Sequence, residues 1–324
     1  MIAFGPIPSR RLGRSLGINN IPPKHCDYSC IYCQLGRTAD RRAYRSSFCS
    51  PHALRLFVEA RVREVSLTGE HIDFLTFVSD GEPTLDLRLG HEIDLLRPLG
   101  IRIAVISNGS LIWQNDVRHD LALADWVSLK VDSVDEQTWR RINRPHHSLD
   151  LRSIRRGMQQ FAEDYPGQLA TETMLVQGIN DSEEQLSAVA EFIAKLRPQT
   201  HYLAVPTRPP AERWVAPPDE ETLNRAYQIF AERLPRVELL VAYEGSEFTA
   251  TGSVEHDILS ITSVHPMRED AVRELLEKTG AQWSAVQKLI DRGLLSEAWY
   301  RDRRFLVRKL EESKNRSTGE RLAG

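Results

Sequence analysis

Three cysteines lie within eight residues of the chain and could together bind one metal centre. Cys26, Cys30 and Cys33 follow a C-x3-C-x2-C spacing, which allows one short loop to fold three thiolates around a common point. A structural zinc site needs a fourth ligand, and in sequence only His25 or Cys49 is near enough to supply it. A [4Fe-4S] cluster held by three cysteines would instead leave one iron open to an exogenous ligand. The spacing alone leaves both alternatives open.

The composition and charge of the chain favour a cytosolic protein with room for more than one domain. Its 324 residues include 41% apolar residues, enough for a large core. A formal net charge of -3 favours neither a nucleic-acid nor a membrane partner for the chain as a whole. Four cysteines, three of them clustered, suit a reducing compartment better than a disulfide framework. Residues 1–6 lack the pattern of a signal peptide, and no apolar run approaches the roughly 20 residues of a membrane span. We therefore expect a cytoplasmic protein with no membrane partner.

An arginine-rich arm precedes the cysteines. One interpretation of Arg10, Arg11 and Arg14 is that they belong to a solvated loop leading into a first strand at residues 16–21. The other is that their guanidinium groups hold an anionic group of a substrate or cofactor, because arginine binds carboxylates and phosphates through paired hydrogen bonds. The sequence leaves both interpretations open.

Helical patterns alternate with short apolar, β-branched runs from residue 51 to residue 241. The expected helices span residues 51–67, 87–99, 116–124, 135–161, 182–196 and 220–234. The expected strands after the first span residues 72–78, 101–106, 126–131, 169–176, 202–205 and 237–241. Such regular alternation implies parallel strands joined by crossover helices. About six such units, with the cysteine loop after the first strand, predict an α/β fold that forms a partial or full β/α barrel.

Polar or Gly- and Pro-rich segments follow five of the expected strands. They span residues 79–84, 107–110, 129–133, 177–181 and 206–208. Each has an ordinary explanation when taken singly, because Asp-Gly and Asn-Gly are common turns and Ser182 is a plausible helix cap. In β/α barrels, however, the chemistry lies where loops leave the C-terminal ends of the strands. Together the segments predict one mouth beside the cysteine loop.

Several of these motifs resemble those of the radical S-adenosylmethionine (radical SAM) superfamily. The cysteine loop, with Tyr32 just before its last cysteine, resembles the superfamily's signature. Asp80-Gly81-Glu82-Pro83 resembles its Gly-Gly-Glu-Pro motif with the first glycine replaced, and Ser107-Asn108-Gly109 resembles its Thr-Asn-Gly turn. The resemblance covers roughly residues 12 to 210. It implies a partial (β/α)6-type barrel, which with the N-terminal arm would span residues 1–245.

The resemblance also implies a cofactor set and a role for each motif. Cys26, Cys30 and Cys33 would bind three irons of a [4Fe-4S] cluster, and the amine and carboxylate of S-adenosylmethionine would bind the fourth. Residues 80–83 would bind the methionyl amine. The implied cofactor-binding residues are Tyr32, Asp80, Gly81, Glu82, Pro83, Asn108, Lys130, Asp132 and Gly178. Within this set, Asn108, Lys130 and Asp132 would reach the carboxylate or ribose, and Tyr32 with the region of Gly178 would pack the adenine.

The implied reaction needs an electron donor such as flavodoxin or ferredoxin. An electron delivered to the cluster would cleave the carbon–sulfur bond of S-adenosylmethionine and leave a 5′-deoxyadenosyl radical. That radical would abstract hydrogen from an unidentified substrate, either RNA or a peptide.

A further resemblance is to a bacterial and archaeal branch related to the wyosine-base synthases, which modify transfer RNA. It is carried by residues 5–13 and Cys33-Gln34-Leu35-Gly36. Those synthases carry a second cluster on upstream cysteines, and this chain has no cysteine before Cys26.

The C-terminal region predicts a second, smaller domain. We expect a winged helix-turn-helix across residues 246–312, because helical patterns at 268–278 and 283–292 are followed by a hairpin at 294–300 and 304–307. We expect the tail at residues 313–324 to be disordered. Residues 251–324 contain thirteen Lys or Arg against twelve Asp or Glu, which is a weak signal for nucleic-acid binding. Three roles of this domain stay open: binding of nucleic acid, docking of a peptide or protein, and packing against the barrel.

The alternative to an enzyme is a redox-sensing regulator that binds DNA, although the strand-end motifs favour the enzyme.

Overall fold

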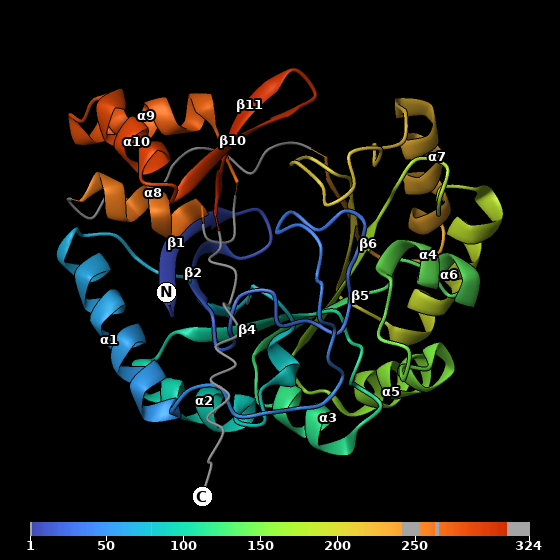
Figure 1. Cartoon of the computed structure of the whole chain (residues 1–324). Helices are drawn as coiled ribbons and strands as arrows, with labels where there is room; N and C mark the ends of the chain where they lie inside the picture. The colour runs from blue at the N-terminus through green and yellow to red at the C-terminus, as the bar shows by residue number, and fades with distance from the viewer. Residues whose placement is uncertain (1, 79, 242–252, 263–265, 310–324) are drawn as a thin grey trace, which may run out of the picture.

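The computed structural model describes residues 2–78, 80–241, 253–262 and 266–309 (Figure 1). Eight strands form one sheet in the order in which they occur in the chain. They are β1 (Ala3–Ser9), β2 (Gly13–Ile18), β3 (Phe74–Phe77), β4 (Arg102–Ser107), β5 (Trp126–Lys130), β6 (Gln168–Met174), β7 (Thr200–Ala204) and β8 (Val237–Leu240). β1 and β2 pair antiparallel, and every neighbouring pair from β2 to β8 is parallel. The sheet curves into an open half-barrel.

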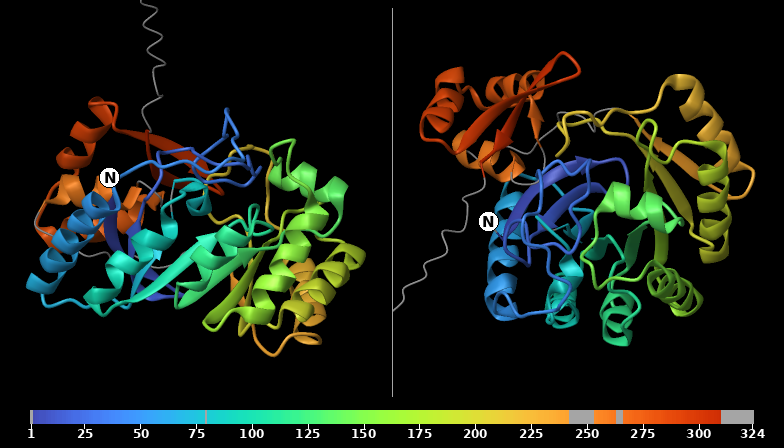
Figure 2. Two further views of the ribbon diagram at one scale, coloured as in Figure 1. Left: turned by 90° about the horizontal axis from the view of Figure 1, so that it is seen from below. Right: turned by 45° about the vertical axis from the view of Figure 1, so that its right-hand side comes forward.

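Helices cover the outer face of this sheet (Figure 2). They are α1 (Pro51–Leu67), α2 (Leu89–Leu96), α3 (Asn115–Ala122), α4 (Glu136–Asn143), α5 (Leu151–Asp164), α6 (Glu183–Leu196) and α7 (Glu220–Ala231), with short 3-10 turns η1 (Pro83–Leu85) and η2 (Arg97–Leu99). Each long helix buries one apolar stripe, as α5 does with Ile154, Met158 and Phe161 at helical spacing. None of the helices within the described ranges is long and apolar enough to cross a membrane.

The strands present alternate residues to two different cores. Val105 and Val127 face the helices, whereas Ala104 and Trp126 face the inside of the half-barrel. Burial on both faces explains why the parallel strands appear in the sequence as nearly continuous apolar runs. The same alternation places polar residues on the inner face near the strands' C-terminal ends, because side chains of a strand change sides at every residue. Lys130 of β5 lies there, directly opposite Glu172 of β6.

The N-terminal arm forms two antiparallel strands, β1 and β2, and only the turn between them, which carries Arg10 and Arg11, matches the expected loop. Phe4 and Ile7 of β1 are buried, and they pack against Ile258 and Ile261 near the other end of the chain. A partner that lies about 250 residues away leaves no local pattern in the arm itself. The expectation of about six strand–helix units agrees with the parallel part of the sheet, where six helical connections join the seven strands β2 to β8, and β1 is the strand that was not expected.

A smaller unit of three helices and a three-stranded antiparallel sheet follows the half-barrel. It consists of α8 (Val254–Thr262), β9 (Met267–Arg268), α9 (Glu269–Thr279), α10 (Trp283–Asp291), β10 (Leu295–Tyr300) and β11 (Arg303–Arg308). The helices and the hairpin expected from the sequence are present to within about one residue at each end. Both residues of the hairpin turn, Arg301 and Asp302, adopt positive φ angles of 49° and 57°, which suits a tight two-residue turn. The expected boundary at 245/246 and the tail at 313–324 lie outside the described residues.

This C-terminal unit packs against the half-barrel beside its mouth (Figure 1). The backbone N–H of Gly5 in β1 donates to Ser260 Oγ in α8 at 3.3 Å. At the other side of the unit, Tyr300 in β10 donates its hydroxyl proton to the carbonyl oxygen of Pro206 at 2.9 Å. Pro206 follows β7, so the hairpin contacts one of the loops that leave the C-terminal ends of the barrel strands.

Candidate active site

A cavity of about 290 Å³ opens at the C-terminal ends of the parallel strands. Nine of the twelve site residues implied by the sequence line it: Cys26, Cys30, Cys33, Tyr32, Asp80, Gly81, Glu82, Asn108 and Lys130. The structure therefore brings the cysteine loop and the loops after β3 and β4, together with the end of β5, to one place. Pro83, Asp132 and Gly178 lie outside the residues that line this cavity.

The cysteine loop is held in place by backbone hydrogen bonds and by the end of α4. The N–H of Cys33 donates to the carbonyl of Cys30 at 3.1 Å, which closes a tight turn between two of the thiols. The N–H of Ile31 donates to the carbonyl of Ile142 at 2.9 Å. Asn143 donates its side-chain N–H to Cys30 Sγ at 3.4 Å. The sequence analysis did not single out Asn143, whose position before a left-handed Arg144 indicated only a helix end.

The environment of the thiols favours their binding to a cation. Burial, and then the carboxylate of Asp132, raises the pKa of Cys30 to about 12. Burial, and then Asp27, raises the pKa of Cys26 well above its usual value. Thiols of this kind keep their protons at neutral pH, and a metal centre with positive charge displaces those protons on binding. These two thiols share one cavity wall with Cys33, and the three together fit a metal cluster better than three free cysteines.

Gly81 joins the loop after β3 to the residue before the first cysteine. A Cβ atom at Gly81 would lie 1.9 Å from the carbonyl oxygen of His25, so no other amino acid fits without moving the backbone. Two backbone hydrogen bonds support the same contact. They run from the N–H of Glu82 to the carbonyl of His25 at 3.0 Å, and from the N–H of Lys24 to the carbonyl of Asp80 at 2.7 Å. The glycine thus sets how closely the two loops approach.

Asp80 presents an unsatisfied carboxylate oxygen at the cavity. The side chain is 3% exposed, and its Oδ2 accepts from Asn19 Nδ2 at 2.8 Å. Its Oδ1 has no hydrogen-bond partner among the residues that the structure describes. Burial raises the pKa of Asp80 to about 6, and the hydrogen bond from Asn19 limits the rise. A ligand amine in the cavity would satisfy the remaining oxygen.

Glu82 uses its carboxylate within the protein. Its Oε1 accepts from the backbone N–H of Thr84 at 3.1 Å, from Thr84 Oγ1 at 2.7 Å and from Ser107 Oγ at 2.7 Å. Its Oε2 accepts from the backbone N–H of Asn108 at 2.8 Å. Glu82 therefore ties the loop after β3 to the loop after β4.

Asn108 is directed toward the cysteine loop. Its side-chain N–H donates to Asp27 Oδ1 at 2.8 Å and lies 3.9 Å from Cys26 Sγ. Asp27 is fully buried, and Ser110 also donates to it. Burial, and then Glu82, raises the pKa of Asp27 to about 7. The sequence analysis did not single out Asp27, because the simplest interpretation of an acidic residue in a loop between cysteines is that solvent surrounds it.

Lys130, Glu172 and Arg11 form a charged group on the cavity wall. Lys130 Nζ lies 2.7 Å from Glu172 Oε1, and Arg11 pairs with the other oxygen of the same carboxylate. Burial opposes the ionisation of Glu172, but Lys130 and Arg11 together lower its pKa to about 2. Lys130 Nζ also lies 4.9 Å from the centre of the Tyr32 ring. The sequence analysis did not single out Glu172, because this residue lies within β6 rather than after it. The signal that could have identified it is an acidic residue within an otherwise apolar strand.

Only one of the three arginines of the arm lies on the cavity that holds the cysteines. Arg11 lines that cavity, Arg14 pairs with Glu70, and Arg10, together with Arg11, lines a second cavity of about 250 Å³ near the first residues of the strands. The structure therefore supports an anion-binding role near the cysteines for Arg11 alone.

Each implied residue outside the cavity has a local role. Asp132 accepts from Tyr32 Oη, from Asn143 Nδ2 at 2.6 Å and from the backbone N–H of Met174 at 2.9 Å, so it orients the residues beside Cys30. The carbonyl of Pro83 accepts from Asn20 Nδ2 at 3.3 Å. Gly178 is exposed with φ of +68° and donates its N–H to Asp181 at 3.0 Å, which is the geometry of a turn.

Replacing Glu172 should destabilise the fold. Glu172→Gln leaves Lys130 and Arg11 facing each other without their counter-charge, so we expect the free energy of unfolding to fall by about 2–3 kcal/mol. A carboxylate whose folded pKa is lowered to about 2 contributes its full stabilisation above the unfolded pKa of about 4.5 and loses it below. The deficit should therefore be equal at pH 6 and pH 8 in anaerobic urea unfolding. Glu238→Gln, in an exposed pair with Arg236, is the control. A deficit no larger than that of the control would contradict the role given to Glu172.

Solved structures with a related fold include two proteins that each cover about two thirds of this chain. One is TYW1 with a lysine-pyruvate adduct bound, with a TM-score of 0.54, 16% identity, and coverage of 68% of this chain and 74% of that chain. The other is SuiB of Streptococcus suis bound to precursor peptide SuiA, with a TM-score of 0.52, 15% identity, and coverage of 69% of this chain and 48% of that chain. At these identities the likeness concerns the fold alone.

Sequence comparison extends over nearly the whole chain. UPF0026 protein MJ1312 of Methanocaldococcus jannaschii is 47% identical over 312 residues, which cover 96% of this chain and 97% of that protein. The family model of the Radical SAM superfamily matches residues 20–192, more than half of the chain. The matched segment begins just before the cysteine loop and includes the loops after β3, β4 and β5. The chain therefore belongs to the radical SAM superfamily.

Proposed function

We propose that the protein uses a [4Fe-4S] cluster to cleave S-adenosylmethionine reductively and to start hydrogen abstraction from a second substrate. When bound, the cluster and S-adenosylmethionine supply the electron transfer and the 5′-deoxyadenosyl radical. Cys26, Cys30 and Cys33 would hold three irons. The observation that carries the proposal is the presence, on one cavity, of these three thiols and of a buried carboxylate oxygen that lacks a partner within the described residues.

The residues of the cavity would bind and orient the cofactor. Asp80 would accept a hydrogen bond from the methionyl amine, and Gly81 would keep the backbone of its loop close enough to the cysteine loop. Lys130 and Arg11 line the cavity and share the single carboxylate of Glu172, so one net positive charge remains on the cavity wall for the carboxylate of the cofactor. Tyr32, held by Asp132, offers an aromatic face beside Lys130. The enclosing loops would limit the access of water to the reacting atoms.

The C-terminal unit is the proposed substrate-docking domain. Its three helices and hairpin support the interpretation as a winged helix, and we retain the division into residues 1–245 and 246–312 as part of the proposal. Tyr300 reaches Pro206, which lines the cavity, so a molecule bound along the hairpin would lie next to the mouth. Trp299, on the same strand, is 71% exposed and offers an apolar surface.

The hairpin favours a peptide or protein over a nucleic acid as the docked molecule. Arg304 pairs with Glu297 and Glu269, and Arg303 lies 3.9 Å from Asp270. Cations that are paired within the protein are poorly available to phosphates. The proposed partners are therefore a peptide or protein substrate and an electron donor of the flavodoxin or ferredoxin type. RNA is the alternative substrate, as the resemblance of residues 5–13 and 33–36 to the wyosine-base synthase branch implies.

The proposed function predicts that reduced, reconstituted protein forms 5′-deoxyadenosine and methionine from S-adenosylmethionine. Anaerobically reconstituted protein would be mixed with S-adenosylmethionine and dithionite, and the products would be quantified by liquid chromatography and mass spectrometry. The same mixture without dithionite is the control. Intact S-adenosylmethionine in the presence of a fully loaded and reduced cluster would instead favour the redox-sensing regulator.

The ion pairs of Arg303 and Arg304 predict weak binding to nucleic acid. Combined replacement of Arg301, Arg303 and Arg304 by alanine should change the slope of log affinity against log salt by less than about one unit, whereas three free phosphate contacts would change it by about three. Fluorescence anisotropy with an RNA hairpin and with a DNA duplex, between 50 and 200 mM salt, provides about the range needed. A change near three units would restore nucleic acid as the docked molecule.

A further inference from the structure

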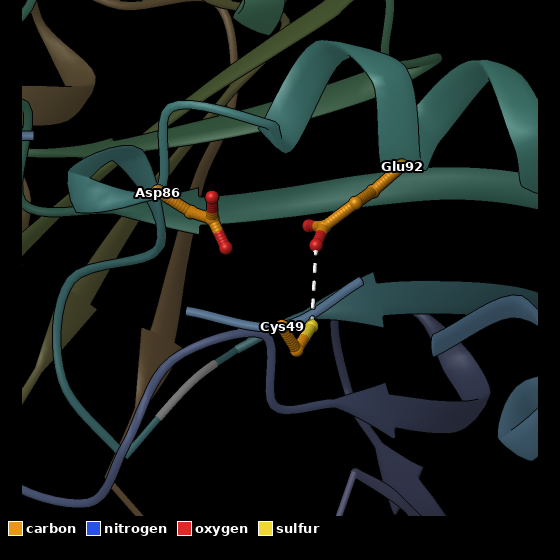
Figure 3. A group of neighbouring side chains, drawn as sticks. All are labelled: Cys49, Asp86 and Glu92. Atoms are coloured by element: carbon orange, nitrogen blue, oxygen red, sulfur yellow. Dashed lines mark hydrogen bonds between the residues drawn. The ribbon is translucent and has the colours of Figure 1, made fainter. Parts of the chain in front are cut away.

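A second group of potential metal ligands lies outside the cavity (Figure 3). Cys49 lies just before the N-cap of α1, Asp86 follows η1, and Glu92 lies on α2. One ligand atom of each lies within 4.8 Å of the other two, and Cys49 Sγ lies 3.6 Å from Glu92 Oε1. In Figure 3 the sulfur and the two carboxylates point into one common space. Three segments that are separate in the sequence thus meet at a thiol and two acids.

The two carboxylates of this group are buried and incompletely satisfied. Asp86 and Glu92 are both 0% exposed. Asp86 Oδ1 accepts from the backbone N–H of Arg88 at 2.8 Å, but Asp86 Oδ2 and Glu92 Oε2 have no hydrogen-bond partner within the described part of the chain. An unsatisfied buried acceptor costs about 1–3 kcal/mol, and more when it carries charge. A bound cation would remove that cost at both carboxylates at once.

We propose that Cys49, Asp86 and Glu92 bind one divalent metal ion, and that the ligand set favours zinc. A thiolate disfavours the hard ions magnesium and calcium, whereas zinc accepts sulfur and carboxylate oxygen together. Zinc–sulfur and zinc–oxygen bonds of about 2.3 and 2.1 Å at a tetrahedral angle place the two ligand atoms roughly 3.5 Å apart. The separation of 3.6 Å between Cys49 Sγ and Glu92 Oε1 agrees with that value. Water would take the fourth position.

One cation lies beside the group. A thiolate and two carboxylates around a doubly charged ion carry one net negative charge. The guanidinium of Arg45, whose side chain is 5% exposed, donates to the backbone carbonyl of Asp86 at 2.7 Å, and it also pairs with Asp116 and Asp120. Without the ion, burial raises the pKa of Cys49 to about 12 and that of Glu92 to about 8, so these two groups would have to keep their protons.

The proposed ion would hold the loop that carries Asp80 and Glu82. Asp86 is only four residues beyond Glu82, and the backbone N–H of Leu87 donates to the carbonyl of Ser46 at 2.9 Å, which joins the loop to the segment of Cys49. A metal ion bound by residues from η1, α2 and the start of α1 would fix these segments relative to one another. This role is structural, and it does not depend on the function proposed for the cavity.

Zinc titration of the full-length protein with its cluster reconstituted tests the proposal. After treatment with a chelator, the protein should bind about one zinc per chain with a Kd below about 1 µM, measured in competition with a chromophoric chelator. Cys49→Ser and Glu92→Gln should each weaken binding at least about 100-fold, because each removes one of three ligands. Asp257→Asn, at a buried acid of the C-terminal unit, is the control and should bind zinc as the parent does.

Iron measured in the same samples separates this site from the cysteine loop. Iron should stay constant while zinc is taken up; zinc that enters only as iron leaves would belong to Cys26, Cys30 and Cys33 and would overturn the proposal. Zinc binding by the parent protein weaker than about 100 µM would also overturn it, whether or not the variants fold. Cobalt is a second probe, because a thiolate–cobalt charge-transfer absorption should appear in the parent and disappear in Cys49→Ser.

Discussion

Replacing Cys30 by alanine should abolish both cluster binding and the formation of 5′-deoxyadenosine. The reconstituted parent protein should hold about four irons and four sulfides per chain, and the variant should lose nearly all of them, because two thiolates cannot replace three around one cluster. Without a cluster no electron reaches S-adenosylmethionine, so product formation should fall below about 1% of the parent rate. Iron and sulfide analysis and product quantification measure the two effects separately.

Cys49 supplies the matched control for this experiment. It is the fourth cysteine of the chain, and it lies against Glu92 rather than on the cavity. Cys49→Ala should therefore keep about four irons and support product formation, although the proposed zinc would be lost. Iron that survives Cys30→Ala and disappears in Cys49→Ala would show that the cluster ligands are assigned to the wrong cysteines.

Asp80→Asn should weaken the binding of S-adenosylmethionine by about 10- to 100-fold while leaving the cluster intact. The substitution keeps the shape of the side chain but removes the charge of the one cavity oxygen without a partner among the described residues. A hydrogen bond to a charged group contributes about 1.5–3 kcal/mol, which corresponds to that loss of affinity. Equilibrium binding to the oxidised, reconstituted protein measures the affinity, and the cluster's absorption spectrum verifies its integrity.

The pKa of Asp80 adds a pH signature. Because burial raises this pKa to about 6, the carboxylate gains its charge as the pH rises from 5 to 7. The ratio of parent to variant affinity should therefore grow over this range. Glu212→Gln, at a buried acid outside the cavity lining, should show no such trend. Equal affinities of parent and Asp80→Asn at pH 7 would exclude Asp80 from the cofactor site.

The variant Glu82→Ala is a less specific test of the cofactor site, since it removes four hydrogen bonds that hold two loops together.

The regular elements could be predicted from sequence because their causes are local. α1 begins and ends where the apolar periodicity and Pro51 indicated, and the hairpin of β10 and β11 follows from alternation around a two-residue turn. The cysteine loop and the loop after β3 were found for a similar reason, since each is a compact motif. β1 was missed because Phe4 and Ile7 are covered by residues that no sequence window contains.

The finer structure of the site depends on how individual atoms are paired, which a motif does not reveal. The sequence identified Glu82 but not that its carboxylate is fully used by Thr84, Ser107 and Asn108. Asn143 and Glu172 come from the end of a helix and the middle of a strand, where their types had ordinary explanations. Their importance follows only from the curvature of the sheet, which places them beside Cys30 and Lys130.

The shared core of β1 and α8 has a consequence for how the chain folds during synthesis. β1 leaves the ribosome well before the residues that cover Phe4 and Ile7, which follow about 250 positions later. Pairing with β2 can form early, but it leaves an apolar surface on an edge strand until those residues are synthesised. The N-terminal strand is thus the part of the half-barrel that reaches its native surroundings last. Removal of α8 would consequently uncover Phe4 and Ile7 and damage the half-barrel at β1.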